Sequence, residues 1–487
     1  MRQKSGKCTQ VFREPSLTRS PPILQQPDSD ETELFRPLSD GVARLLRLYR
    51  SSPLARDGSR SLFIQAHVLP LKLLGAVVMA RVLGPSGYGM VNLMIAAVAV
   101  LQVVPQGGID NAVLRFGAQY AVAGEWGRLR GLLRTGVLLS LACGLVTALG
   151  LWAWGEFGQS TPMLRALVYA TIPLACLLPL DSLLAAAMQA TGHGVASQVP
   201  RGVLRPWVFY LALFACLAWL PRWIVPPQVL LLQALATLGS AAAAAWLFAR
   251  LRPGALATAP VRCDLRTWWG SALSYGMLSG LIVINMQVDL LMVGWLAGTH
   301  DVGLYRIATQ AAALVGMPLG AADAFIAARI VRFHQQGDRA GLQRLLALSA
   351  ASTSLLALLA ALAIAIWGRS LIGAVFGQVY APAYPAMLVL CLAQLLNVAF
   401  GSVSLVLGMT GAERVAARVT AVGLALNLAL NLILIPIWGA LGAAIATCTA
   451  MVVWNLLMLW QVTSRLAVDA SLLGALRWGL ARRPGRV

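Results

Sequence analysis

The sequence predicts an all-α polytopic membrane protein of twelve transmembrane helices, arranged as two six-helix lobes in a parallel repeat, with both termini in the cytoplasm. Three observations support this fold class. The 487-residue chain is 59% hydrophobic and only 11% charged, with a mean hydropathy of +0.74, whereas soluble globular chains carry about 25% charged residues. Its basic residues gather on alternate connecting segments, and its two halves share glycine-containing motifs.

Twelve apolar runs are long enough to cross a bilayer, which takes roughly 20 residues in a helix. With the N-terminus inside, the cytoplasmic segments and their flanks hold 32 of the 38 Lys and Arg residues, and five others lie near the opposite ends. This asymmetry follows the positive-inside rule, so the net charge of +20 does not require a nucleic-acid partner. The runs cover about residues 61–82, 88–109, 131–154, 163–188, 195–220, 227–249, 269–297, 303–326, 345–367, 383–408, 413–437 and 440–462.

The domain boundaries follow from these runs and from the polar segments around them. The first segment is rich in Pro and Ser and is predicted to be a largely disordered cytoplasmic tail. Within it, residues 40–50 form a basic amphipathic segment, either on the anionic membrane surface or as a solvated helical linker. The predicted parts are the tail 1–59, an N-terminal lobe 60–250, a cytoplasmic linker 251–268, a C-terminal lobe 269–465 and a basic cytoplasmic tail 466–487.

The sequence predicts neither a metal site, nor a cofactor, nor an enzymatic activity. The seven cysteines are scattered singly, without the Cys-x-x-Cys or Cys/His spacing of metal and redox sites. The chain contains no Gly-rich phosphate loop and no nucleophile elbow. A membrane-embedded glycan polymerase or ligase is the alternative of a different class, but it needs a sizeable outer loop that these runs leave no room for.

An internal repeat relates the two halves. "LGPSGYGMV" (83–91) aligns with "AGTHDVGLY" (297–305) at an offset of 214 residues, which pairs Gly84 with Gly298. "GGID" (107–110) aligns with "GAAD" (320–323) at offset 213, and "ATG" aligns later with "MTG". An even number of helices in each half gives the lobes the same orientation, and transporters built in this way move one lobe against the other around a central site.

Several of these motifs carry a resemblance to a known family. "ARVLGPSGYG", "GGIDNAVLRF", "DLLMVGWLAGTHDVGLY" and "LNLALNLILIPIWGALGAAIATC" resemble the polysaccharide flippases of the MOP (MATE-like) exporter superfamily, over about residues 60–465. The resemblance implies transport of undecaprenyl-diphosphate-linked oligosaccharide units across the bacterial inner membrane. Many relatives carry an arginine a few residues into the eighth helix, where this chain has Gln310.

Two charges lie deep in equivalent spans. Lys72 is the twelfth residue of the first span, about 15–18 Å from either end, and such a charge is costly enough to suggest a use. Asp289 in span seven corresponds to Gly75, three residues from Lys72 and so on nearly the same helix face. We expect Lys72 and Asp289 to line the substrate cavity, with Lys72 opposite a diphosphate. The alternative is that Lys72 forms a structural ion pair with Asp289 or another carboxylate.

Acidic and basic side chains also mark the cytoplasmic ends of spans two and eight. Asp110 and Arg115 form one such set, and Asp323 and Arg329 form the equivalent one. Two interpretations remain open for them. They admit and bind substrate at the cytoplasmic mouth, or they are interfacial ion pairs that anchor the topology.

Two further residues are candidates for coupling to an H⁺ or Na⁺ gradient. Asp181 lies in span four without a repeat partner, and it is either a coupling-ion site or a helix–helix hydrogen-bonding group. His67 lies five residues before Lys72, about 140° around the helix, and is either a buried, hydrogen-bonded histidine or a proton relay.

The predicted function is therefore an alternating-access flippase for exopolysaccharide or O-antigen biosynthesis. Its expected partners are the lipid-linked oligosaccharide, membrane lipids, polymerase and chain-length proteins of the same pathway, and a coupling ion. A multidrug or organic-cation antiporter of the same fold is the alternative, although it favours carboxylates in the N-terminal lobe where span one offers Lys72 and no acid.

Overall fold

The computed structural model describes residues 53–106, 108–158, 161–220 and 223–481. The chain divides into two units, Met1–Arg56 and Asp57–Val487. Of the first unit only residues 53–56 are described, as the start of a helix. The predicted amphipathic segment at 40–50 and most of the predicted tail therefore lie outside the described residues.

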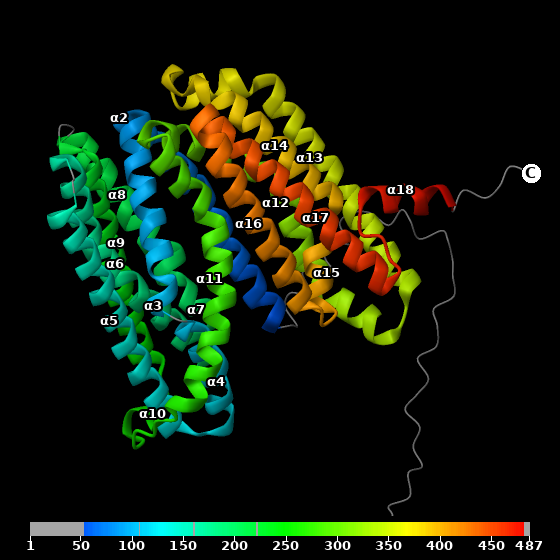
Figure 1. Ribbon diagram of the computed structural model, residues 1–487. Helices are drawn as coiled ribbons and strands as arrows, with labels where there is room; N and C mark the ends of the chain where they lie inside the picture. Colours follow the sequence, from blue (N-terminus) through cyan, green and yellow to red (C-terminus); the bar gives the residue numbers. More distant parts are fainter. Residues whose placement is uncertain (1–52, 107, 159–160, 221–222, 482–487) are drawn as a thin grey trace, which may run out of the picture. The chain divides into compact units, whose positions relative to one another are not determined.

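Every element in the described part of the chain is a helix (Figure 1), as the sequence predicts. The first half comprises α2 (Pro53–Leu101), α3 (Val103–Gln106), α4 (Ile109–Ala123), α5 (Trp126–Phe157), α6 (Pro162–Ala190), α7 (Gly194–Val199), the π-helix η2 (Pro200–Leu204), α8 (Arg205–Trp219), α9 (Pro226–Leu251) and α10 (Gly254–Thr258). The second half comprises α11 (Leu265–Leu296), α12 (Thr299–Gln336), α13 (Arg339–Val375), the 3₁₀ helix η4 (Gln378–Ala383), α14 (Tyr384–Phe400), α15 (Val403–Met409), α16 (Glu413–Trp438), α17 (Ala440–Leu466) and α18 (Leu472–Ala481).

Eleven helices of the described part are long and apolar enough to span a membrane, so the protein is a multi-pass membrane protein. The sequence predicts twelve spans. The difference arises in α2, where the runs 61–82 and 88–109 fall into one continuous helical element. The number twelve and the cytoplasmic position of both termini stay predictions.

A glycine divides α2 into two arms. Gly84 has φ 66° and ψ 176°, a backbone conformation that residues other than glycine avoid. The dark-blue and lighter-blue arms of α2 run in opposite directions on either side of it (Figure 1). The helical ladder is therefore interrupted where the sequence predicts the end of its first span.

The backbone repeats the same glycine conformations in the second half. Gly298, the counterpart of Gly84, has φ 89° and ψ 174°, so both halves turn in the same way at this point. Two other aligned pairs also share positive φ: Gly124 with Gly337 (70° and 68°), and Gly192 with Gly411 (88° and 80°). The internal repeat read from the sequence is thus present in the backbone.

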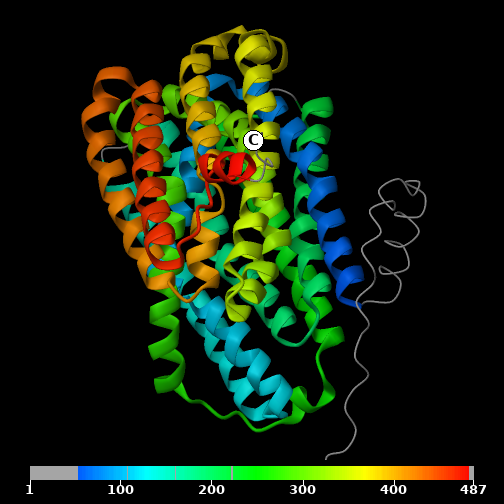
Figure 2. The ribbon, with the colours of Figure 1, turned by 90° about the vertical axis from the view of Figure 1, so that its right-hand side faces the viewer.

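Each half packs mainly within itself, and in Figure 1 most blue-to-green helices lie to the left of the yellow-to-red ones, which come to the front in Figure 2. In the first half α6 is central and packs against α4, α5 and α9. In the second half α14 and α17 pack together and against α12 and α16, respectively. The lobe boundaries 60–250 and 269–465 remain predictions, and we call these sets the N-lobe and the C-lobe.

Helix α11 belongs to both packing regions. Near its start, Trp268 is buried in a core with Leu129 and Leu132, and its Nε1 donates to Tyr120 Oη at 3.1 Å. Near its end, Leu290 and Val293 join the main C-lobe core. The first part of α11 therefore packs with the N-lobe, although the predicted boundary assigns it to the C-lobe.

The predicted linker and the predicted C-terminal tail both contain residues that contact the neighbouring helices. In the linker, Arg262 N donates to Gly127 O, and Arg130 Nη1 donates to Ala259 O at 2.7 Å. The segment 466–487, predicted only as a basic tail, contains helix α18, which packs against α13.

Exposed tryptophans lie near both predicted ends of the spans. Indole rings favour the membrane–water interface, where their apolar bodies and polar N–H groups are both accommodated. Because both interfaces attract such rings, they do not distinguish the two orientations of the spans. Those near the predicted outer ends include Trp152, Trp154, Trp219, Trp223, Trp295, Trp367 and Trp438, and those near the predicted cytoplasmic ends include Trp246, Trp269 and Trp460, each more than 40% exposed.

Candidate substrate and coupling sites

Lys72 lies in the first arm of α2 with an exposed side chain, next to the exposed Leu73 and Leu74. Three residues on, Gly75 packs directly against the ring of Tyr210 on α8, so a Cβ there would overlap the ring. Within the described part of the chain, Lys72 has neither a hydrogen-bond nor an ion-pair partner. An intramembrane charge of this kind nearly always faces the bundle interior or a water-filled cavity.

The predicted ion pair between Lys72 and Asp289 does not form. Asp289 instead accepts hydrogen bonds from three neutral side chains: Asn431 Nδ2 at 2.8 Å, Thr447 Oγ1 at 2.8 Å and Tyr305 Oη at 3.1 Å. These partners come from α16, α17 and α12, so helices of the same lobe hold the carboxylate. Residue spacing could place Lys72 and Asp289 on comparable helix faces, but it could not fix the partners of either one.

Asp289 and Arg306 line one cavity of about 370 Å³ in the C-lobe. The Nε atom of Arg306 is buried there without a hydrogen-bond partner. The walls also carry amides and hydroxyls, including Asn285, Thr309 and Asn427, and the indole of Trp454. The cavity is within the usual size range of small-molecule sites and holds groups of both charges.

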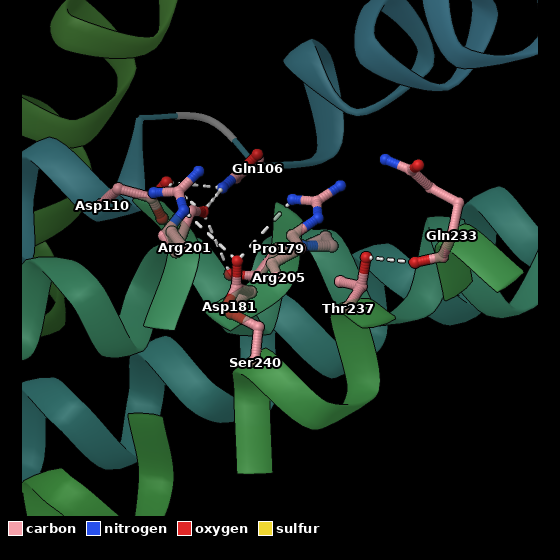
Figure 3. Close-up of polar contacts among 10 residues, drawn as sticks. Gln106, Asp110, Pro179, Asp181, Arg201, Arg205, Gln233, Thr237 and Ser240 are labelled. Carbon is pink, nitrogen blue, oxygen red and sulfur yellow. Dashed lines mark hydrogen bonds and ion pairs between the residues drawn. The ribbon is translucent and has the colours of Figure 1, made fainter. Parts of the chain in front are cut away.

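The N-lobe contains a second charged group, centred on Asp181 in α6 (Figure 3). Its side chain is fully buried, and Oδ1 accepts a hydrogen bond from Ser240 Oγ at 2.9 Å. Oδ2 lies 3.2 Å from Nε of Arg201 and 3.9 Å from Nη1 of Arg205. Neither arginine directs an N–H at Oδ2, so these contacts are ion pairs rather than hydrogen bonds. The helix–helix interpretation of Asp181 therefore matches this geometry.

The two arginines flank an irregular turn. Arg201 lies within η2, and Arg205 N donates to Pro200 O in the wider π-helical pattern. Pro206 follows directly and lacks the N–H that would continue the helical ladder. Single π-helical turns of this kind are frequent at functional sites.

Asp110 and Asp323 occupy equivalent positions and have equivalent partners. Asp110 Oδ2 accepts from Ser182 Oγ at 2.6 Å and from Gln106 Nε2 at 2.7 Å, and Oδ1 is buried without a partner. Asp323 accepts a hydrogen bond from Ser402 Oγ. In both lobes a serine hydroxyl, from α6 at Ser182 and from the residue before α15 at Ser402, thus donates to the acid.

The remaining predicted residues have other contacts. Arg115 is exposed, and its guanidinium lies over the ring of Phe116 at 5.6 Å from the centroid. His67 is half-buried on α2. Gln310 donates through Nε2 to Tyr88 Oη at 3.1 Å, and its Oε1 is buried without a partner.

The two lobes meet closely where α2 turns and α12 begins. A Cβ on Gly89 would overlap the carbonyl of Thr299, and one on Gly303 would overlap the carbonyl of Pro85. Because Gly89 is the repeat counterpart of Gly303, and Pro85 of Thr299, the contact is pseudo-symmetric. Three further bonds cross between the lobes nearby: Arg81 to the carbonyls of Ala374 and Val375, and Tyr380 Oη to Ala80 O.

Three arginines of the Asp181 group and of the C-lobe cavity were not among the predicted site residues. Arg201 and Arg205 counted as charges of a cytoplasmic connection, and Arg306 as a charge at an outer helix end. The spacing of Arg201 and Arg205 by four residues, inside an apolar run and beside two prolines, is a signal that could have identified them. Arg306 has no comparable signal, since its cavity exists only in the folded protein.

In the described ranges, no cluster of three or more His, Cys, Asp or Glu side chains could hold a metal ion. The polar groups inside the membrane-spanning helices are cations, isolated carboxylates, amides and hydroxyls. Such groups can bind an anion, a monovalent cation or a proton, and they can hydrogen-bond a polyol.

Comparisons with known proteins identify the fold and the family. A sequence profile described as "Polysaccharide biosynthesis protein" matches residues 54–322. An inward-facing multidrug-resistance MATE family transporter of the MOP superfamily is similar with a TM-score of 0.69 at 13% identity, over 82% of this chain and 94% of that one. The lipid II flippase MurJ, in an inward closed conformation, is similar with a TM-score of 0.64 at 12% identity, over 88% and 93%.

An outward-facing MATE transporter structure gives a TM-score of 0.58 at 15% identity, over 86% of this chain and 97% of that one. At these identities the structural likeness concerns the fold, which is MATE-like as predicted. No curated protein sequence matches the chain significantly.

Proposed function

The chain belongs to the polysaccharide biosynthesis protein family of MOP-superfamily flippases, and on that premise we propose that it carries undecaprenyl-diphosphate-linked oligosaccharide units across the bacterial inner membrane. The family and its structural relatives are transporters and flippases rather than enzymes. A lipid-linked substrate and the surrounding membrane lipids are the partners that this family implies. Pathway proteins such as a polymerase and a chain-length regulator remain proposed partners.

The observation that carries the proposal is the exposed side chain of Lys72, which has neither a hydrogen-bond nor an ion-pair partner among the described residues. The sequence predicts that this residue lies near the middle of the first span. A diphosphate must cross the low-dielectric centre of the bilayer, where a counter-charge stabilises it most. A lysine without a protein partner is available for that purpose, and ammonium groups bind phosphate well. We therefore assign Lys72 to the diphosphate of the substrate.

Arg306 is the matching candidate in the C-lobe. Its unpartnered Nε faces a polar cavity that also contains amides, hydroxyls and an indole ring, groups that suit the sugar and diphosphate parts of one substrate. Asp110, Arg115 and Asp323 stay candidates for contacts at the cytoplasmic mouth. The hydroxyl partners of the two aspartates favour a structural contribution for these acids.

Asp289 fits a coupling role better than substrate binding. Its carboxylate has only neutral hydrogen-bond partners among the described residues, and a charge so placed in a membrane is costly unless a proton or cation neutralises it. The surrounding oxygens of Asn431 and Thr447 could also contact Na⁺. Asp181, by contrast, already faces two arginines, and His67 keeps only its sequence-based candidacy.

An organic-cation antiporter remains the second candidate, because a multidrug-resistance MATE family transporter shares the fold. The unpaired cation at Lys72 disfavours it, since a cationic substrate would meet a like charge. In vesicles, the flippase proposal predicts transport of a lipid-linked saccharide and no ion-gradient-driven efflux of ethidium.

The deciding experiment uses the full chain in proteoliposomes loaded with a fluorescent undecaprenyl-diphosphate-linked saccharide. Appearance of the sugar at the opposite face is measured with an impermeant glycosidase. Transport by the wild-type chain, and its loss in Lys72→Ala at equal protein level, would support the proposal. Ethidium efflux without saccharide transport would favour the antiporter.

A further inference from the structure

Helix α18 is connected to the end of the C-lobe by a specific set of hydrogen bonds. The side chain of Gln343 donates to Asp469 O at 2.8 Å and accepts from Asp469 N at 2.7 Å. Asp469 Oδ1 in turn accepts from Ser471 N at 2.9 Å, and Ser471 Oγ accepts from Gly474 N at 3.2 Å. These contacts fix the start of α18 on α13, so its position is built into the fold.

The two sides of α18 differ sharply in exposure. Ser471 and Ala475 are buried on the side that packs against α13. Leu473 and Leu476, which lie on the opposite side, are 65% and 55% exposed. Arg477 is also exposed and lies beside these leucines on the helix surface. A short helix in a membrane protein thus presents an apolar stripe bordered by a cation.

The position of α18 corresponds to the end of the spans that carries most of the positive charge. It follows the end of α17 at Leu466 and contacts Gln343, five residues into α13. The helix runs across the direction of α17 in Figure 1 and is seen nearly end-on in Figure 2. The orientation suits a helix that lies in the plane of the interface rather than across the bilayer.

A cavity of about 540 Å³ adjoins the helix. Arg477 and Trp478 line it from α18, and Gln343, Thr463 and Asp469 line it from the neighbouring segments. Asp469 is already engaged by Ser471. The exposed guanidinium of Arg477 at this cavity suits the phosphate of a lipid headgroup.

We propose that α18 is an interfacial docking helix for anionic phospholipids of the cytoplasmic leaflet, with Leu473 and Leu476 in the acyl boundary and Arg477 on the headgroup. Charge complementarity selects this occupant. The cytoplasmic leaflet is anionic and attracts basic segments, and the sequence after α18 adds Arg482, Arg483 and Arg486 without one acidic residue. The proposal is independent of what the protein transports.

The test measures where Leu473 lies in a bilayer. In the full chain, Cys8 and the exposed Cys263 are both replaced by Ser. A new cysteine, Leu473→Cys, then carries a nitrobenzoxadiazole label. It is reconstituted into phosphatidylcholine vesicles with or without phosphatidylglycerol. Quenching by a nitroxide on the lipid acyl chain reports insertion, and iodide reports exposure to water. A label at Gln336→Cys, an exposed site at the end of α12, is the matched control and should respond to iodide alone.

The expected result is strong lipid-nitroxide quenching at residue 473 with phosphatidylglycerol, which weakens in phosphatidylcholine alone. One arginine near an anionic surface contributes about 1 kcal/mol, so Arg477→Gln should lower the ratio of inserted to free helix about fivefold. Arg477→Lys, which keeps the charge, should retain insertion. Gel filtration of each variant checks that the chain stays folded and monodisperse.

Three results would overturn the proposal. Equal quenching with and without phosphatidylglycerol, unchanged by Arg477→Gln, would mean that anionic lipid is not the partner. Iodide quenching at residue 473 in both membranes would place the helix in water. Energy transfer between labelled copies, in place of lipid quenching, would likewise show that a second copy of the chain covers the leucines.

Discussion

Charged side chains inside the membrane-spanning helices differ in how their charge is compensated. Asp181 faces two arginines, and Asp289 has three neutral donors. Lys72 has no partner among the described residues. A transporter needs groups whose interactions change during the cycle, and a residue without a permanent partner can change its interaction at the lowest cost. This comparison separates Lys72 and Asp289 from Asp181 in their expected roles.

Replacement of Lys72 should affect transport without affecting folding. Lys72→Ala removes a side chain that contacts no carboxylate, so protein abundance should stay near wild type while flipping is lost. Lys72→Arg should retain part of the activity, since it keeps the charge but changes geometry and reach. Complementation of a flippase-null strain, with immunoblotted protein level, measures both. Rescue of Lys72→Ala by an added Asp289→Ala would contradict this assignment, because it would show that the two charges compensate each other.

Asp289→Asn should separate coupling from folding. The amide is nearly isosteric: its oxygen can accept from Asn431, and its NH₂ group can donate to the hydroxyl oxygen of Thr447, so the protein should remain abundant. It cannot bind a proton or attract Na⁺, so transport should lose its dependence on an imposed H⁺ or Na⁺ gradient. Saccharide transport in proteoliposomes with each gradient applied in turn checks this. Gradient-driven transport at the wild-type rate in the variant would exclude Asp289 as the coupling group.

The residue pairings could not be predicted from the sequence. The depth of Lys72 and Asp289 followed from their positions in apolar runs, since each residue adds a fixed rise along a helix. Their partners depend on how each helix is rotated about its own axis, and packing of several helices together determines that rotation. For this reason the partners of Asp289 are Asn431 and Thr447, which are uncharged and distant in sequence, rather than Lys72.

At the scale of elements, the span formed by α7, η2 and α8 is the clearest departure from a regular helix. Its π-helical turn places Arg201 and Arg205 beside Asp181 on α6, and Asp181 is bonded further to Ser240 on α9. Three elements of the N-lobe therefore meet at one buried carboxylate. Such a group is costly to disrupt, because removal of one member leaves the others unpaired.

Asp181→Ala should destabilise the N-lobe. Loss of one member of a buried ion pair typically costs about 3–5 kcal/mol, whereas Ser240→Ala removes a single hydrogen bond and should cost about 1 kcal/mol. Arg205→Ala should have an intermediate effect, since Asp181 keeps Arg201. Thermal unfolding of the purified variants in detergent would rank them in this order. An Asp181→Ala protein as stable as wild type, but uncoupled from the ion gradient, would instead support a coupling-ion site.

The elements themselves were largely predictable, because their length and apolar composition are set by the bilayer. The boundaries of the helices were less predictable where the backbone turns sharply. Gly84 lies between the predicted spans 61–82 and 88–109, and the positive φ that separates the two arms of α2 occurs at this residue. Helical geometry resumes directly on either side of it, so the turn is shorter than the predicted connection. The tail after Leu466 was read from charge alone, and the apolar positions Leu473 and Leu476 within it mark the helix that forms there.

For the whole molecule, the internal repeat determines how the lobes meet. The pseudo-symmetric contact brings two helix backbones together at Gly89 and Gly303 without intervening side chains. Alternating access requires this contact to open so that substrate can leave on that side. A backbone contact without interlocking side chains can separate and re-form with little rearrangement, which suits a gate.

Gly89→Leu should hold this contact open. The added side chain would overlap the backbone of Thr299, and overpacking of about 1–3 kcal/mol shifts a two-state equilibrium roughly 5- to 150-fold. Val302→Cys, buried in the wild-type chain, should then react with an impermeant maleimide added outside whole cells, while saccharide transport falls. Gly150→Leu is the matched control, because a Cβ at Gly150 meets no neighbouring atom within 4 Å. If Val302→Cys stays unreactive in Gly89→Leu and transport persists, the glycine contact is not the gate.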